Sequence, residues 1–331
     1  MEIFALFDCI ITPACLISQT AGGLKIGMLL FLVASGLTLV FGVLGVINFA
    51  HGALYMLGAY FSWQVMSITG HFGLAVISGA IGVGIFGLLF ERLLINKVYN
   101  ADLLVQILLC YSVILILDDL VMIIWGDEFL SGIGVPEIFQ VPPLFIFDAI
   151  IPPFHIAIIV ISIIIALLLW IIMTKTKFGK LVRATAVNPR MLEALGINTN
   201  VIKAGVFMLG SFLAGLGGAL AASLGSVVSG MGNSIIIESF IVTVIGGMGS
   251  ISGAFLASII IGMARSFGAV AMPLFTDGIM FLIMLFIGFN KTVLDGNGPG
   301  GAFPAAGNLD EKSGWLFNSG ASVLFWSIAV G

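Results

Sequence analysis

Long apolar segments follow one another along most of the chain, separated by short polar stretches. Asp118 and Asp119 are the only Asp, Glu, Lys or Arg residues within the runs 26–47, 52–69, 72–90, 103–125, 154–173, 204–224, 251–261 and 279–289. Several of these runs reach the ~20 residues that a helix needs to cross a bilayer core, and none shows the alternation of a barrel strand. With a shorter apolar piece at 235–245, the pattern predicts an all-α membrane protein: a polytopic bundle of about eight transmembrane helices.

Composition supports this prediction, because 60% of the 331 residues are hydrophobic and only 8% are charged. A soluble domain carries about 25% charged residues, which it needs to cover a surface facing water. The three cysteines, at positions 9, 15 and 110, have no CxxC or metal-type spacing and are interpreted as unpaired. We expect three parts: an N-terminal segment 1–21, interpreted as interfacial; a transmembrane domain 22–290; and a Gly/Pro-containing tail 291–331 with a short apolar segment.

The distribution of charge predicts the orientation. Segment 174–203 holds six of the twelve Lys and Arg residues, and Arg92 and Lys97 mark a second basic loop. Segment 118–153 holds six acidic residues and no basic one. Because basic loops stay on the cytoplasmic side, residues 91–101 and 174–203 are predicted to face the cytoplasm and 126–152 the outside.

Two apolar runs are interrupted by glycine and small polar residues, near 45–52 and near 245–253. At membrane depth, backbone leaves helical geometry only where protein or a water-filled cavity satisfies it, and paired interruptions favour a transport pathway. The predicted substrate pathway comprises Asn48, Phe49, His51, Gly52, Gly246, Gly247, Gly249 and Ser250. On this hypothesis Gly52→Leu blocks transport and leaves the protein assembled.

Other interpretations of these residues stay open. His51 can instead cap a helix or bond a carbonyl across an interface, and glycines in membrane helices usually serve close packing. Gly210, Ala214, Gly218 and Ala222 recur every four residues, which predicts a packing face. No charged residue lies in 41–60 and only Glu238 lies near the second interruption, so we expect weak substrate recognition through backbone dipoles and an apolar lining.

A short helix is predicted in the second basic segment. Asn188 suits the N-cap, Pro189 the first helical position and Gly196 the position after the end. Two turns are marginally stable alone, and Met191, Leu192 and Leu195 form an apolar face, so a docking partner is expected. The predicted docking element comprises Asn188, Pro189, Met191, Leu192, Glu193, Ala194, Leu195 and Gly196.

Three segments together carry a resemblance to a known family. They are 36–52 (GLTLVFGVLGVINFAHG), 183–197 with its RATA and ALGI motifs, and 245–254 (IGGMGSISGA). They resemble permease subunits of bacterial branched-chain amino-acid ABC importers, over about residues 22–290. Only the end of the chain departs from the family, because such permeases usually stop soon after the last span.

The resemblance implies a multi-pass protein of the bacterial inner membrane that works with several partners. These are a second permease subunit, two cytoplasmic ATPases and a periplasmic binding protein, with membrane lipid around the spans and no nucleic acid. ATP and Mg²⁺ would bind the ATPases, so this chain would be non-catalytic, with no metal or cofactor of its own. Residues 188–196 would be the coupling helix to the ATPase.

Alternative functions remain at this point. The same machine carries urea, short amides or other small polar or organic-acid substrates in related permeases. An ion-coupled secondary transporter would be expected to hold ionisable groups at mid-membrane, and runs 26–47, 72–90 and 204–224 contain none. A membrane enzyme would need a catalytic constellation, and the three scattered histidines form no HExxH motif.

Overall fold

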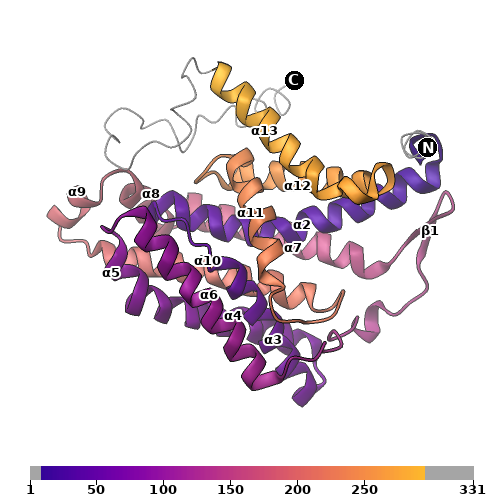
Figure 1. Cartoon of the computed structure of the whole chain (residues 1–331), viewed down its shortest axis with the longest axis horizontal. Coiled ribbons are helices and arrows are strands. Elements are labelled where there is room, and N and C mark those ends of the chain that lie inside the picture. The colour runs from indigo at the N-terminus through magenta and orange to yellow at the C-terminus, as the bar shows by residue number, and fades with distance from the viewer. Residues whose placement is uncertain (1–8, 295–331) are drawn as a thin grey trace.

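The computed structural model describes residues 9–294 and is almost entirely helical (Figure 1). Six of the helices are long and apolar enough to cross a membrane. They are α2 (Pro13–Leu44), α4 (Phe72–Phe90, continued by η1 Glu91–Ile95 and α5 Asn96–Val98), α6 (Leu103–Trp125), α7 (Pro153–Lys175), α10 (Thr199–Ala221) and α12 (Ile251–Ala271).

The remaining elements connect or flank these six helices. The helices among them are α3 (His51–Thr69), α8 (Lys177–Val187), α9 (Pro189–Ala194), α11 (Gly232–Gly246) and α13 (Thr276–Leu294). There are also two 3₁₀ turns, η2 (Glu137–Phe139) and η3 (Pro273–Phe275). The strands β1 (Leu144–Ile146) and β2 (Ala149–Ile151) form an antiparallel pair, in which Leu144 lies opposite Ile151. The all-α polytopic fold is therefore confirmed. Two of the eight expected spans, α3 and α13, are helices but are not among the six.

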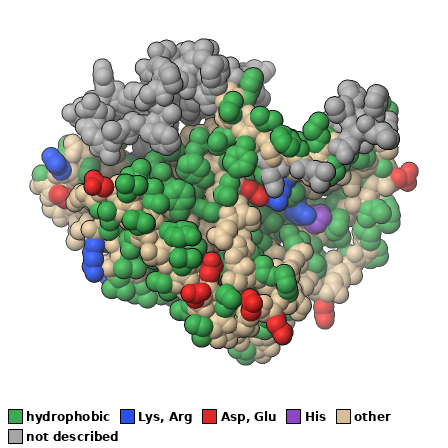
Figure 2. All heavy atoms as spheres, viewed as in Figure 1, with side chains coloured by type: hydrophobic (Ala, Val, Ile, Leu, Met, Phe, Trp, Pro, Cys, Tyr) green, Lys and Arg blue, Asp and Glu red, His purple; other side chains and the backbone are tan. Residues whose placement is uncertain are grey.

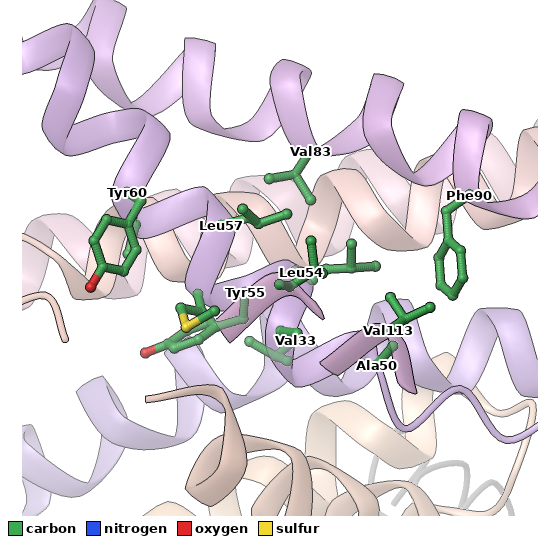
Figure 3. Close-up of a cluster of buried hydrophobic side chains, with 14 of the residues drawn as sticks. Val33, Ala50, Leu54, Tyr55, Leu57, Tyr60, Val83, Phe90 and Val113 are labelled. Carbon is green, nitrogen blue, oxygen red and sulfur yellow. The ribbon is translucent and has the colours of Figure 1, made fainter. Parts of the chain in front are cut away.

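The helix α3 is less apolar than a lipid-facing helix because its first half is buried inside the protein. Its residues His51 to Tyr60 are all buried, so protein side chains rather than lipid surround its first half. Around it lies the largest cluster of buried side chains, in which Val33, Leu54, Leu57 and Val83 point toward one another (Figure 3). α3 tolerates polar residues because its neighbours are helices.

The small-residue face of α10 packs as predicted. A Cβ added at Gly210 would lie 2.9 Å from the Gly36 carbonyl oxygen of α2. At Gly218 it would meet the Tyr55 carbonyl of α3 at a separation that real Cβ atoms do not show. These glycines let three helix backbones approach one another closely, and packing is their role.

The two basic segments lie at one end of the molecule. The Lys203 ammonium, at the start of α10, sits 5.0 Å from the centroid of the Tyr99 ring, in the first basic loop. Figure 1 shows α5, α8 and α9 together at this end, with β1 and the start of α2 at the opposite end. The arrangement agrees with the predicted orientation, in which 91–101 and 174–203 face one side and 126–152 the other.

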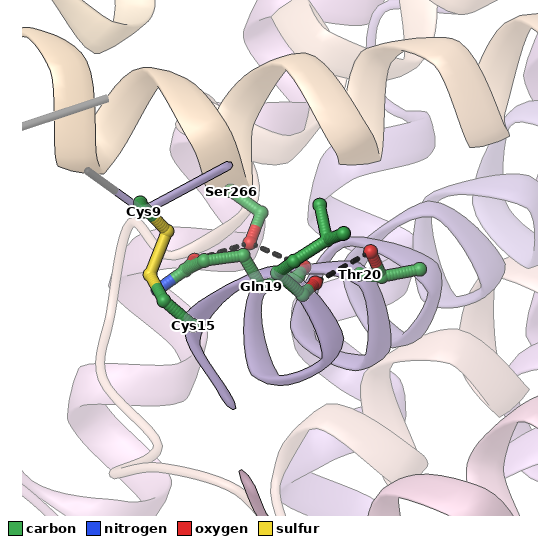
Figure 4. Close-up of a disulfide and its surroundings, with 6 residues drawn as sticks. Cys9, Cys15, Gln19, Thr20 and Ser266 are labelled. Carbon is green, nitrogen blue, oxygen red and sulfur yellow. Dashed lines mark hydrogen bonds between the residues drawn. A yellow bond between two sulfur atoms is a disulfide. The ribbon is translucent and has the colours of Figure 1, made fainter. Parts of the chain in front are cut away.

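The interpretation of all three cysteines as unpaired is wrong for two of them. Cys9 and Cys15 form a disulfide with Cα atoms 5.1 Å apart, beside the Ser266 hydroxyl, which donates to the Gln19 backbone and side-chain oxygens (Figure 4). Their spacing matches no motif, because the pairing arises from the fold-back of the chain just before Pro13. Cys110 is free and buried, as expected.

The two ends of the chain were expected to form segments separate from the transmembrane domain, at residues 1–21 and 291–331. α2 begins at Pro13, so residues 13–21 continue the helix that contains the first apolar run. Residues 1–8 and the tail from 295 onward, including its short apolar segment, lie outside the described residues.

Candidate functional site

The first interruption separates α2 from α3 over residues 45–50. Gly45 takes a left-handed conformation (φ +68°) that ends α2, and the chain then turns back into the protein until α3 begins at His51. The His51 side chain is fully buried, and its Nε2–H donates to the Val33 carbonyl oxygen at 3.0 Å. Val33 lies eleven residues before Leu44, the last residue of α2. The start of α3 therefore lies beside α2 at a point about 16 Å from the C-terminal end of α2.

Asn48 and His51 each keep one polar atom without a partner in the described part of the chain. These atoms are Asn48 Nδ2 and His51 Nδ1, both on fully buried side chains. The Cys110 thiol of α6 approaches the Asn48 Oδ1 at 3.8 Å. His51 thus bonds a carbonyl of a neighbouring helix, the alternative to a substrate contact that the sequence left open.

Gly52 serves close helix packing. A Cβ on Gly52 would lie 2.9 Å from the Ile236 Cβ and closer still to the Gly232 carbonyl oxygen of α11. Real Cβ atoms essentially never come within 3.0 Å of such neighbours. The expectation that Gly52→Leu leaves the assembly intact is therefore corrected: leucine has no space there unless α3 and α11 separate.

The second interruption separates α11 from α12 over residues 247–250. Gly247 and Gly249 both have φ of +90°, and Ser250 caps α12 by accepting a hydrogen bond from the Gly253 N–H at 3.1 Å. Gly246 and Gly253 face each other so closely that neither has room for a Cβ. This turn lets the two helices reverse direction with their backbones in contact.

The two interruptions approach each other at the basic end of the bundle. A Cβ on Gly42, in the last turn of α2, would lie 2.5 Å from the Gly249 Cα. The Phe49 ring of the first interruption stacks on the Phe240 ring of α11, with centroids 6.2 Å apart. The predicted pathway residues thus come from two neighbouring segments, although Asn48, His51, Gly52, Gly246 and Gly247 are buried. Their role in transport stays a prediction.

Charged side chains inside the helices were missed by sequence reasoning. Arg265 of α12 pairs with Glu238 of α11, with Nη1 and Oε1 2.5 Å apart. Lys25 of α2 donates to the His155 Nε2 of α7 at 3.4 Å. Lys25 directly precedes the predicted span 26–47, and Arg265 lies four residues beyond the end of the predicted span 251–261. Extending the apolar pattern through a single charge would have found them. Sequence analysis identified Glu238 near the second interruption but not Arg265 as its partner.

The short helix in the second basic segment forms with the predicted boundaries. The Asn188 Oδ1 accepts from the Met191 N–H at 3.1 Å, and Gly196 is left-handed (φ +79°). The Ile197 N–H donates to the Leu192 carbonyl and the Gly196 N–H to the Glu193 carbonyl, which is the Schellman arrangement of a helix end. The cap and the stop are both confirmed.

The apolar face of α9 is divided between the inside and the outside. Leu192 is 7% exposed, whereas Met191 and Leu195 are 63% and 68% exposed. The Thr199 hydroxyl also donates to the Glu193 carboxylate, which ties α9 to α10. Contacts within the chain therefore help to hold α9 in place, and docking of a partner on this helix stays a prediction. Only Met191 and Leu195 remain available to a partner, beside a hollow of about 350 Å³ lined by residues 193 and 196–200.

Comparison with known proteins identifies the family. The family model described as "Branched-chain amino acid transport system / permease component" matches residues 19–288. The chain is 29% identical to the high-affinity branched-chain amino acid transport system permease protein LivH of Salmonella typhimurium, over 62% of this chain and 70% of that protein. It is 29% identical to BraD of Pseudomonas aeruginosa, named as a permease protein of the same kind of system, with the same coverage.

An archaeal relative matches over a somewhat longer stretch. The probable branched-chain amino acid transport permease protein LivH of Methanocaldococcus jannaschii is 30% identical, over 68% of this chain and 72% of that protein. No solved structure matches the chain. Because the family model covers more than half of the residues, with α3 to α12 and both interruptions inside its limits, the chain belongs to the permease-component family of branched-chain amino acid transport systems.

Proposed function

We propose that this chain is the transmembrane permease subunit of an ATP-driven, binding-protein-dependent importer in the bacterial inner membrane. It moves branched-chain or related hydrophobic amino acids into the cytoplasm. A second permease, two ATPases that hold ATP and Mg²⁺, and a periplasmic binding protein complete the assembly. The chain itself has no catalytic role. Family membership supports this proposal, and the names of the relatives supply the substrate class.

One observation in the structure supports coupling to a cytoplasmic ATPase. α9 is capped at both ends, is anchored through Leu192 and presents Met191 and Leu195 on the basic side of the molecule. A short helix that is held firmly and has exposed apolar side chains can transmit a movement. A partner bound to Met191 and Leu195 would displace α8 and α10 together with α9, because α9 is joined to both. Leu192 holds the helix in place, and Met191 and Leu195 make the contact.

The test replaces the two exposed side chains together. In Met191→Ala with Leu195→Ala, we expect the permease to insert normally, while uptake and the stimulation of ATP hydrolysis by loaded binding protein fall at least about tenfold. A tenfold fall corresponds to the loss of roughly 1.4 kcal/mol, which is within the range for truncating a side chain at a buried contact. The matched control is Leu93→Ala with Leu94→Ala, two exposed leucines at the same end of the bundle in η1.

Normal uptake with normal stimulation in the double variant would show that α9 is not the coupling element. Leu192→Ala gives a separate readout, because we expect it to lower the thermal stability of the permease itself. The substrate is tested by comparing uptake of leucine with that of urea and acetamide into vesicles holding the complete transporter. Uptake of urea or acetamide in place of leucine would favour the alternative substrate classes.

A further inference from the structure

The ion pair between Glu238 and Arg265 lies at membrane depth. α11 begins beside Gly52, at the level where His51 bonds to Val33. Further along, the Thr38 hydroxyl of α2 donates to the Thr243 hydroxyl of α11 at 3.1 Å. Glu238 lies between these two landmarks, about 8 Å from Thr243 along the helix. The carboxylate is therefore well inside the bundle, and Arg265 reaches it from α12.

One member of the pair is accessible at the protein surface. The Glu238 side chain is 8% exposed and the Arg265 side chain 38% exposed. Figure 2 shows acidic, basic and histidine side chains close together to the right of the middle of the viewed face, among hydrophobic ones. A charged group that faces lipid is costly, so charges in membrane helices face protein or a water-filled space. Arg265 faces protein through its pairing with Glu238, and its exposed part is the surface that a bound head group would contact.

The two helices do not depend on the ion pair for their contact, because α11 and α12 already pack through Gly246 and Gly253. The hydroxyl of Tyr55 of α3 points out of the hydrophobic cluster that holds its ring (Figure 3). The ion pair itself joins α11 and α12, with Glu238 eight residues before Gly246, about 12 Å along the helix.

We propose that Arg265 and Glu238 form the site that recognises the head group of a zwitterionic amino acid during its passage through the membrane. The Arg265 guanidinium binds the substrate carboxylate with two parallel hydrogen bonds, and the Glu238 carboxylate binds the substrate ammonium. Binding of the substrate breaks the ion pair within the protein and forms two between protein and substrate. The cost of breaking the first offsets much of the gain, so net binding is weak and release is fast. This inference rests on the proposed function and replaces recognition by backbone dipoles alone.

The first test asks whether the site is open to water. Arg265→Cys in a Cys110→Ser background is reconstituted with the complete transporter and treated with the membrane-impermeant anionic reagent methanethiosulfonate ethylsulfonate. We expect modification of the introduced thiol. Ile260→Cys is the control, because Ile260 is 48% exposed on the same helix and is expected to face lipid and stay unmodified. A thiol at position 265 that does not react overturns the proposal.

The second test separates recognition from structure. We expect Arg265→Gln to lower leucine uptake about tenfold or more, the effect of losing a hydrogen-bonded charge, with the same amount of assembled complex. The exchange Glu238→Arg with Arg265→Glu restores the ion pair with its charges reversed. Recovery of uptake in this exchange variant means that the pair is structural and overturns the proposal. If the unaltered transporter takes up no leucine, the proposed function fails instead, whatever the reactivity of the introduced thiol.

Discussion

At the first interruption the chain leaves α2 through Gly45, crosses six residues and enters α3 with the buried polar side chains of Asn48 and His51. At the second, four residues with two left-handed glycines connect α11 and α12, whose backbones touch at Gly246 and Gly253. In the first, a buried side chain bonds a neighbouring helix and Gly52 packs closely against α11; in the second, the absence of side chains lets the helices meet. Similar sequences thus stabilise two different kinds of break, and substitutions distinguish them.

The largest effect is expected at Gly52, where α3 meets α11. Gly52→Leu places a branched side chain against the Gly232 carbonyl and Ile236, so we expect loss of the folded permease together with loss of transport. The measurement is the yield of monodisperse protein after gel filtration in detergent. Intact protein without transport would instead support the original hypothesis of a pathway residue.

A smaller but still large effect is expected at the second interruption. Gly253→Ala forces a Cβ against the Gly246 carbonyl, and because backbone cannot shift cheaply, we expect a loss of about 3 kcal/mol, seen as a lower unfolding temperature. Gly73→Ala is the matched control, since a Cβ there meets nothing within 4 Å. Equal unfolding temperatures for the two variants would contradict close packing at this turn.

At the first interruption the expected loss comes from a side chain. His51→Ala removes the hydrogen bond to the Val33 carbonyl and leaves a space in a fully buried site, which costs about 2 kcal/mol. The exposed His71 provides the comparison, because His71→Ala should leave thermal unfolding unchanged. If His51→Ala unfolds like the unaltered protein, the bond to α2 does not hold the start of α3.

The smallest effect is expected at Gly45, which needs its left-handed backbone but no space. A Cβ at Gly45 meets nothing within 4 Å, so Gly45→Ala should cost only about 1 kcal/mol of backbone strain, and Gly45→Asn less. Comparing the stability lost in Gly45→Ala with that lost in Gly253→Ala, in one unfolding assay, separates a glycine required for its backbone conformation from one required for close packing. A larger loss of stability in Gly45→Ala than in Gly253→Ala would contradict close packing as the stricter requirement.

Much of this architecture could be predicted from local pattern. Apolar runs located α6 and α7 to within a residue or two, because burial in lipid demands an uninterrupted helix. Asn188, Pro189 and Gly196 marked α9, because caps and stops depend on the backbone preferences of single residues. The burial of Asn48 and His51 could not be predicted, because it depends on α2 and α6, which the local pattern does not place.

The sequence by itself determined the membrane class, most helix boundaries, the two breaks and the capped helix α9, because each depends on hydropathy or backbone preference within a few residues. Only the tertiary structure decided that Leu192 points inward while Met191 and Leu195 face outward, that Cys9 pairs with Cys15, and that Arg265 reaches Glu238 across 27 residues. Such contacts depend on the angle and depth at which helices pack. Close approach at glycines such as Gly36, Gly52 and Gly253 sets those angles, and no local pattern records which backbone each glycine will meet.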